Sequence, residues 1–293
     1  MSIVNATPTV WAGEILRALE TILVYANPRI MNHKYEGEIR ESGDSVKILT
    51  VGDVTVKPYT KNAAIDAPER LTDADLRLVI TEADYFNVAI DDIDAAQIDY
   101  DLMVEVARRA AYSMRAEIDG FAASLYTDIP AGVGLGTDAS PITGFNASAS
   151  KAYDQLVTMK TQLDTTDTPE DGRFAVIPPW YEGYIQKDPR FTSYGTPGNR
   201  TQLENGMMAG DNGLIGRAAG FDLYRSNNVP NVAGAKHKII GGHNSAWSFA
   251  SQILQTEAYR LEAGFSDGLK GLSVYGGKVI RPNNLAVQVA SDA

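Results

Sequence analysis

The feature that most constrains the fold is one long amphipathic pattern between residues 101 and 126. Apolar side chains recur in it every three or four positions: Met103, Ala107, Ala110, Met114, Ile118, Phe121 and Leu125. Such spacing gathers them on one face of an α-helix. Asp99 and Asp101 supply the negative charge that the start of a helix favours. A helix of this span is about 39 Å long, so we predict a spine helix at 101–126 around which the rest of the chain packs.

The segment before this helix is predicted to be a long β excursion with two legs. Its strand-forming stretches, rich in β-branched residues, are 45–51, 54–59, 75–81 and 86–90. Between the legs, the polar stretch 60–72 contains the turn signal Asp66-Ala67-Pro68-Glu69. Charged side chains are scattered along both legs, which is typical of an arm that solvent reaches on both faces.

Shorter elements are expected on either side of this core. Helical periodicity predicts a short amphipathic helix over 11–25, ended by Asn27-Pro28, and further helices over 147–163 and 180–186. Strands are predicted at 173–177, 221–226, 236–241, 254–261, 272–275 and 285–290. These elements together indicate a mixed α+β fold.

The composition restricts the partners. The chain of 293 residues carries 37 acidic and 26 basic side chains, and its net charge is −11. A protein that grips nucleic acid usually has a basic face or tail, so tight DNA binding is disfavoured. The absence of cysteine excludes disulfides and thiolate chemistry. Residues 1–10 lack the pattern of a signal peptide, and no apolar stretch is long enough to span a membrane. We therefore expect a soluble protein that stays in the cell that makes it.

Motifs for binding a ligand are weak. The glycines of 213–220 have neither dinucleotide-loop nor P-loop spacing, and a strand follows them, so they are interpreted as turn glycines, as are those of 132–136. The densest carboxylate cluster comprises Asp91, Asp92, Asp94, Asp99 and Asp101. It lacks the glycine and the closing glutamate of a calcium loop, and a solvated helix entry is the favoured interpretation. The sequence therefore predicts no metal and no cofactor.

No catalytic constellation is apparent either. His33, His237 and His243 lie far apart in the sequence, and no G-x-S-x-G elbow occurs. A site assembled in space from His243 with Ser245 or Ser251 remains the alternative, and it would make the chain a soluble α/β enzyme. We predict no catalytic residue.

The last third of the chain resembles the major capsid proteins of tailed bacteriophages. Gly216, Gly220, Ser226-Asn227 and Pro230 are similar to their "G-x-x-x-G-x-x-V/I-x-x-S-N-x-V/L-P" pattern. The segment from Gly242 to Ala250 resembles the small-residue helix that follows in those proteins. Residues 257–272 and the run from Tyr275 to Pro282 resemble their closing strands. The order and spacing of these motifs carry the resemblance.

This resemblance implies the Hong Kong 97-like capsid fold. Its parts would be an N-terminal arm at 1–34, an extended β-hairpin arm (E-loop) at 35–94, a peripheral domain at 95–146 and 255–293 built on the spine helix, and an axial domain at 147–254. The implied function is structural, not enzymatic: the chain would self-assemble as hexamers and pentamers into an icosahedral head around double-stranded DNA, without sequence-specific binding. The implied location is the virion capsid, after synthesis in the bacterial host cytoplasm.

The implied partners follow from that assembly. Candidate contacts between subunits are the charged residues of the arm: Lys57, Lys61, Glu69, Arg70 and Arg77. Because the N-terminal arm starts almost at Met1, scaffolding is expected from a separate protein, or the chain is a processed form. A portal and a decoration protein are the other expected partners. Some relatives join subunits by a Lys–Asn bond, but no motif here supports one and no cross-link is predicted. The shell of an encapsulin-type bacterial nanocompartment, which shares the fold, is the alternative.

Overall fold

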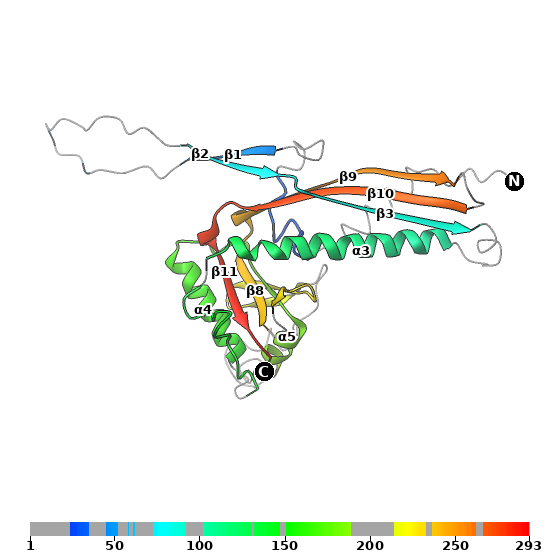
Figure 1. Ribbon diagram of the computed structural model, residues 1–293. Coiled ribbons are helices and arrows are strands. Elements are labelled where there is room, and N and C mark those ends of the chain that lie inside the picture. The colour runs from blue at the N-terminus through cyan, green and yellow to red at the C-terminus, as the bar shows by residue number, and fades with distance from the viewer. Residues whose placement is uncertain are drawn as a thin grey trace.

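The computed structural model describes residues 24–34, 45–51, 58, 61, 73–91, 102–130, 132–146, 151–188, 214–232, 236–261 and 266–292. Two bodies are visible in Figure 1: an elongated one of strands lying along a long helix, and a wedge that hangs below one end of it. The described helices are α3 (Leu102–Ser124), α4 (Lys151–Thr165) and α5 (Pro179–Lys187). The expected mixture of helix and sheet is confirmed.

The spine helix lies almost where the sequence predicts it. α3 runs from Leu102 to Ser124 and continues as a 3₁₀ turn, Leu125–Asp128. Its apolar stripe is buried at Ala111, Met114, Ile118, Ala122 and Ala123. These side chains belong to one large hydrophobic cluster, which confirms that the 3.6-residue period marks the face that packs on the body.

One face of a three-stranded antiparallel sheet packs on α3. Its strands, in spatial order, are β3 (Glu82–Asp91), β10 (Ser266–Val279) and β9 (Trp247–Arg260). Leu269 and Tyr275 point from β10 into the cluster that contains the α3 side chains. A Cβ at Gly271 would meet the ring of Phe86 at 2.4 Å, so this glycine lets the ring lie flat across β10.

The wedge contains a six-stranded sheet. Its strands are β4 (Arg173–Ile177), β5 (Leu214–Ala218), β6 (Phe221–Arg225), β7 (Asn231–Val232), β8 (Lys236–His243) and β11 (Leu285–Ala290), in the order β11-β8-β4-β6-β5 with β7 beside β8. All five residues of β4 are buried because its two faces serve two cores. Phe174 and Val176 join the cluster of α3, whereas Ala175 and Ile177 face α4 and α5. The predicted ranges of β4 and β11 are confirmed.

The two bodies are joined by two neighbouring strand connections. β8 passes to β9 through the 3₁₀ turn Asn244–Ala246, and β10 passes to β11 through the 3₁₀ turn Pro282–Asn284. The carbonyl oxygen of Ala246 accepts hydrogen bonds from the backbone N–H groups of Ile280 and Arg281, both at 2.8 Å. Each connection is therefore tied to the other at the point where the sheets meet.

The expected arm begins as a two-stranded antiparallel sheet. β1 (Ser45–Val51) pairs with β2 (Asp73–Val79) over their full lengths, in a register that sets Ser45 opposite Val79. These two strands confirm the two-legged excursion. The strand expected at 54–59 lies outside the described residues except for Pro58.

Three expectations about the elements need correction. The helix expected from Gly242 to Ala250 is wrong: it is one 3₁₀ turn between two strands, because Trp247 and Phe249 alternate with Ser248 at the period of a strand. The boundary expected at 254/255 falls inside β9. β11, which falls in the peripheral domain expected at 95–146 and 255–293, pairs with β8 in the wedge.

Of the glycines of 213–220, which the sequence predicts to be turn residues, Gly220 is one, whereas Gly216 lies inside β5 next to a register shift. Ala219 and Gly220 form the two-residue turn between β5 and β6, with φ of 50° and 83°. Two central residues with positive φ match the twist of an antiparallel hairpin. Gly220 is thus a turn residue, and a strand follows it where a phosphate loop would need a helix.

Candidate inter-subunit surfaces

The arm carries the residues that the sequence predicts as subunit contacts. Lys61 is exposed, and so is Arg77, which occupies a β2 position facing Lys47 in the strand register. Lys57, Glu69 and Arg70 lie outside the described residues. The contacts themselves stay a prediction, since they would be made with another chain.

The root of the arm is fixed in the core. Leu78 and Ile80 are buried, whereas Val79 between them is 40 % exposed. A Cβ at Gly276 of β10 would lie 2.5 Å from the carbonyl oxygen of Val79, so this glycine allows the arm to cross β10 closely. Only Ile80 and Thr81 separate β2 from β3. The second leg therefore runs into the edge strand of the three-stranded sheet, and a load on the arm passes directly to the body.

Part of the segment expected as an N-terminal arm belongs to the body. Ile30 and Met31 are fully buried in the cluster of α3. The indole Nε1–H of Trp247 donates to the carbonyl oxygen of Ile30 at 2.6 Å. Asn32 forms a parallel bridge beside Ser248. Residues 24–34 therefore pack on the body and touch the edge of the three-stranded sheet at one bridge, that of Asn32 to β9.

A buried carboxylate holds the start of this segment on the spine helix. Asp119 of α3 is 2 % exposed and accepts hydrogen bonds from the backbone N–H groups of Val24, at 3.1 and 3.2 Å, and of Ala26, at 3.4 Å. Burial raises the pKa of Asp119, and the hydrogen bonds from residues 24–26 and the charge of Arg115 oppose that rise. In the sequence, the only signal of this role is that Asp119 is an acidic residue next to Ile118 of the apolar stripe.

Asp119→Ala is expected to lower the free energy of unfolding by about 2 kcal/mol, because backbone N–H groups of residues 24–26 lose their acceptor. Asp119→Asn tests the charge. The pKa of Asp119 is raised in the folded chain. The stability that Asp119 adds to the fold is therefore fully present below the unfolded pKa of about 3.9, and it is lost as the pH rises through the folded pKa. The stability of the wild type relative to Asp119→Asn should therefore grow on acidification.

Urea unfolding of the full, unassembled chain at several pH values measures this difference. Asp128→Asn is the control, because Asp128 follows the same helix and is 43 % exposed beside Lys278. A wild-type advantage over Asp119→Asn that stays constant or shrinks on acidification contradicts the assignment.

The enzyme alternative had depended on His243. Its Nδ1 lies 2.7 Å from the hydroxyl of Ser245, but the backbone N–H of Ser245 also donates to Nδ1, at 3.2 Å. Burial lowers the pKa of His243, the nearby charges of Arg173 and Arg281 lower it further, and a hydrogen bond with the backbone of Asp171 raises it. The ring caps the 3₁₀ turn, and neither of its described hydrogen-bonding partners supplies the carboxylate that would orient a catalytic histidine.

The remaining candidates for ligand binding are dispersed. His33 packs against Phe249, and His237 against Trp180, with ring centroids 5.5 and 5.6 Å apart. Of the acidic cluster near the start of α3, the structure describes only Asp91. Within the described ranges, no group of three or more His, Asp or Glu side chains could hold a metal ion. No helix in the part of the chain that the structure describes is long and apolar enough to cross a membrane.

Comparison with known proteins decides the family. Residues 76–288, most of the chain, match a family model described as phage capsid protein. The chain belongs to this family. A solved structure from Mycobacterium phage Che8 is 27 % identical to this capsid protein, with a TM-score of 0.72 over 91 % of this chain and 90 % of the other. The capsid of cyanophage P-SCSP1u is 15 % identical, with a TM-score of 0.64 over 95 % and 88 %. A virus-like particle from Pyrococcus furiosus is 11 % identical, with a TM-score of 0.54 over 95 % and 97 %. Comparison with the curated proteins gives no match.

These matches confirm the resemblance seen in the sequence. The chain is a structural major capsid protein of the tailed-phage type, not an enzyme, and its place is the capsid of the virion. The neighbours below 25 % identity add agreement of fold alone.

Proposed function

We propose that this capsid protein assembles as hexamers and pentamers into an icosahedral shell of the Hong Kong 97-like type that encloses double-stranded DNA. The observation that carries the proposal is the arm. Its root is buried at Leu78 and Ile80, and its two strands form a separate ribbon on the side of the three-stranded sheet opposite α3 (Figure 1). A two-stranded ribbon is only marginally stable alone in water, so the arm gains stability by lying on another subunit.

The physics of a shell explains why such an arm is useful. A closed ring of identical head-to-tail contacts multiplies weak affinities into a stable assembly. Each contact stays weak enough for a misplaced subunit to leave. In this proposal the charges of Lys57, Lys61, Glu69, Arg70 and Arg77 pair with charges on a neighbour's elongated body.

The parts of the subunit are assigned by their sheets. α3 with the three-stranded sheet would form the peripheral domain, and the wedge with α4 and α5 the axial domain near the ring centre. The last residues, from β11 onward, then belong to the axial domain. Residues 35–94 would be the E-loop, and residues 1–34 the N-terminal arm, of which 24–34 pack on the body. Synthesis in the host cytoplasm, a separate scaffolding protein, a portal and a decoration protein complete the proposal.

Negative-stain electron microscopy and light scattering on the full chain, expressed alone and with a scaffolding protein, test the proposal. Closed particles, or open sheets of hexamers and pentamers with masses of megadaltons, support it. A monodisperse monomer or dimer under all of these conditions overturns it.

Deleting residues 62–69 is expected to reduce the yield of closed shells about tenfold or more. Loss of only 1.4 kcal/mol per contact weakens each contact tenfold, and the loss is repeated around every ring. Particle counts by electron microscopy measure the yield, and unchanged thermal unfolding of the unassembled chain shows that the body is intact. Lys61→Gln, which removes one charge of the arm, is the milder control. Normal closed shells from the deletion variant contradict the role of the arm.

A further inference from the structure

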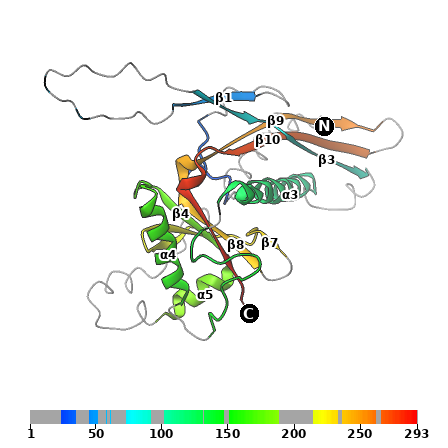
Figure 2. The same ribbon diagram turned by 60° about the vertical axis from the view of Figure 1, so that its left-hand side comes forward.

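The strand β3 has a free edge. It lies at the end of the three-stranded sheet, with β10 on one side, and none of the described strands pairs with its other side. Figures 1 and 2 show it as the outermost strand of that sheet, running along α3. In an antiparallel pair, every second residue directs its backbone N–H and C=O groups away from the partner strand. β3 therefore presents hydrogen-bonding groups for a further strand along its ten residues.

The features that usually protect an edge strand are few in β3. Natural edges are protected by lysine, by proline or by a bulge. β3 contains neither lysine nor proline, and its pairing with β10 runs without a register shift from Glu82 to Asp91. It carries negative charge instead, on Glu82, Asp84 and Asp91. These carboxylates oppose pairing with a second copy of β3, and they favour a strand that brings positive charge.

A groove lies between this edge and the spine helix. Its volume is about 610 Å³. The side chains of Phe86 and Val88, which line it from β3, are half-buried, so the groove has an apolar surface that another strand can cover. A groove between a strand edge and a helix suits the binding of an extended segment as an added strand. The residues that line it from α3 are Arg109, Ala110, Ser113, Met114 and Glu117.

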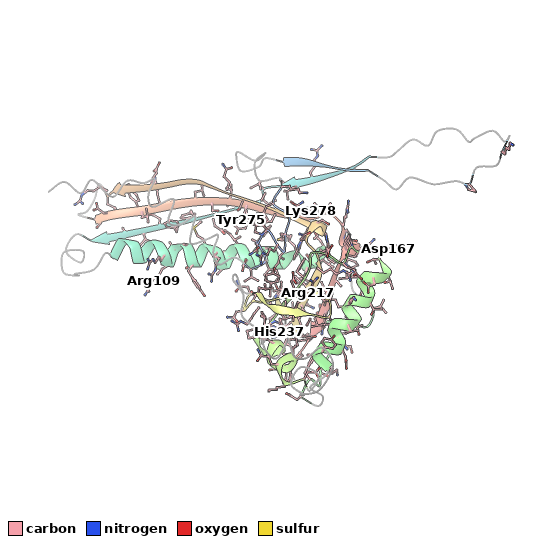
Figure 3. The ribbon with its side chains drawn as sticks, turned by 180° about the vertical axis from the view of Figure 1, so that it is seen from behind. Arg109, Asp167, Arg217, His237, Tyr275 and Lys278 are labelled. Carbon is pink, nitrogen blue, oxygen red and sulfur yellow. The ribbon has the colours of Figure 1, made fainter. Side chains whose placement is uncertain are left out.

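One end of the groove is acidic. Asp84 accepts a hydrogen bond from the hydroxyl of Tyr275, which Figure 3 labels. Burial raises the pKa of Tyr275, and the charges of Asp84, Glu82 and Glu117 raise it further, so the three carboxylates lie near one point. Arg109 also lines the groove, but it already has a partner, and it sets one positive charge against these three. A basic side chain from another subunit would therefore be stabilised at this end.

The arm contains a segment with the complementary pattern. The sequence predicts a strand at 54–59, which carries Lys57 and no acidic residue. Pro58, the one described residue of this strand, is exposed, and so is Lys61. If this segment runs antiparallel to β3 with Lys57 opposite Asp84, the ammonium group lies on the face of the sheet that carries the acidic end of the groove.

The same register satisfies the other face of the sheet. It sets Val56 opposite Tyr85, whose side chain is 78 % exposed. A β-branched side chain opposite an aromatic ring is a favourable cross-strand pair, and it covers the ring. Pro58 falls opposite Ala83, near the end of β3, where the missing N–H of proline does little harm. One alignment thus pairs the charge, the exposed ring and the proline.

We propose that residues 54–57 of one subunit add to the free edge of β3 of a neighbouring subunit as an antiparallel fourth strand, with Lys57 at the acidic end of the groove. This inference rests on the proposed shell function and names the surface that receives the arm. Backbone hydrogen bonds supply the affinity, and the side chains fix the register. The contact is head-to-tail, because the segment given and the edge that receives it are different, so it can be repeated around a closed ring.

An exchange of charge between the two sites tests the proposal in the full chain. Lys57→Glu and Glu117→Lys should each reduce the yield of closed shells about tenfold or more, since like charges then meet at every contact. The double variant restores opposite charges, and its yield should return to within about threefold of the wild type. The matched control is Glu170→Lys, the same change at an exposed position of the wedge. It should not restore the yield of Lys57→Glu. Unchanged thermal unfolding of the unassembled variants shows that the fold is intact.

A peptide of residues 53–61 tests the addition of the strand itself. Bound to the unassembled full chain, it should protect backbone amides of β3 from hydrogen exchange. A peptide of the same sequence with N-methyl groups on alternate residues keeps its charge and cannot form the ladder of hydrogen bonds. We expect it to bind at least about tenfold weaker.

Equal binding of the two peptides overturns the proposal, as does a double variant that forms no more shells than the single variants. Rescue of Lys57→Glu by Glu170→Lys overturns it as well, because only the net charge would then matter. Wild-type shells without coupling between positions 57 and 117 reject this inference alone. Absence of shells from the wild type rejects the proposed function.

Discussion

Trp247→Ala is expected to lower the free energy of unfolding by about 4 kcal/mol, the range of a large aromatic side chain removed from a core. The indole is fully buried and stacks on Phe174 of the wedge, with centroids 5.5 Å apart and planes 5° from parallel. It also donates to the carbonyl oxygen of Ile30. One side chain therefore contacts both bodies and the segment 24–34, and its loss leaves a cavity where all three meet.

Trp247→Phe is the matched variant, because it keeps a ring and removes the N–H. The carbonyl oxygen of Ile30 then loses its donor, which costs about 1–2 kcal/mol, with a smaller cavity term. Urea unfolding of the unassembled chain measures both variants. A loss below about 1 kcal/mol for Trp247→Ala would show that the three parts do not depend on this side chain.

Gly136→Ala should be the most damaging of the glycine substitutions in the loop after the spine helix. Gly136 has a φ of 79°, and a Cβ there would lie 2.6 Å from the carbonyl oxygen of Val289. The backbone cannot easily move away, since the N–H of Val289 donates to Leu135 at 2.8 Å and its carbonyl oxygen accepts from Ile142 at 2.9 Å. We expect a loss of about 3–5 kcal/mol.

Gly134→Ala separates the two causes of that loss. Gly134 has nearly the same φ, 76°, but its nearest contact would be the methyl group of Thr158 at an ordinary 3.6 Å. This variant should lose only the backbone term of about 1–2 kcal/mol. Thermal or urea unfolding of the two variants side by side gives the difference. If both lose the same amount, the close approach of β11 to this loop does not limit the residue at position 136.

Elements with a strong internal period could be predicted from the sequence. The spine helix and β4 follow from their own residues, because an unbroken apolar stripe or run has few other solutions. β9 and β10 were predicted too short. β10 contains Gly268, Gly271, Gly276 and Gly277, which resemble turn signals. In the fold at least three of them make room: Gly271 for Phe86, Gly276 for the arm, and Gly277 for Leu125. The reason for each glycine lies on another element and is not visible locally.

The candidate functional residues also differ in how far the sequence predicts them. The paired strands β1 and β2 could be predicted from the sequence, since strand patterns flank a polar stretch with a turn signal. The hydrogen bonds between Asp119 and residues 24–26 could not be predicted, because nothing near either segment in the sequence indicates that the two are in contact. The contacts of Lys61 and Arg77 with another chain stay a prediction, since no pattern within one chain specifies what lies on a neighbour.

The paired strand connections at Ala246 have a mechanical consequence. A single connection would act as a hinge and let the wedge rotate relative to the elongated body. Here two connections run side by side, and the carbonyl oxygen of one, at Ala246, accepts two backbone hydrogen bonds from the other. Rotation of the wedge would have to break both hydrogen bonds and twist both connections at once. The angle between the two bodies of the subunit is therefore fixed, and in the proposed shell a change of curvature would fall at the contacts between subunits.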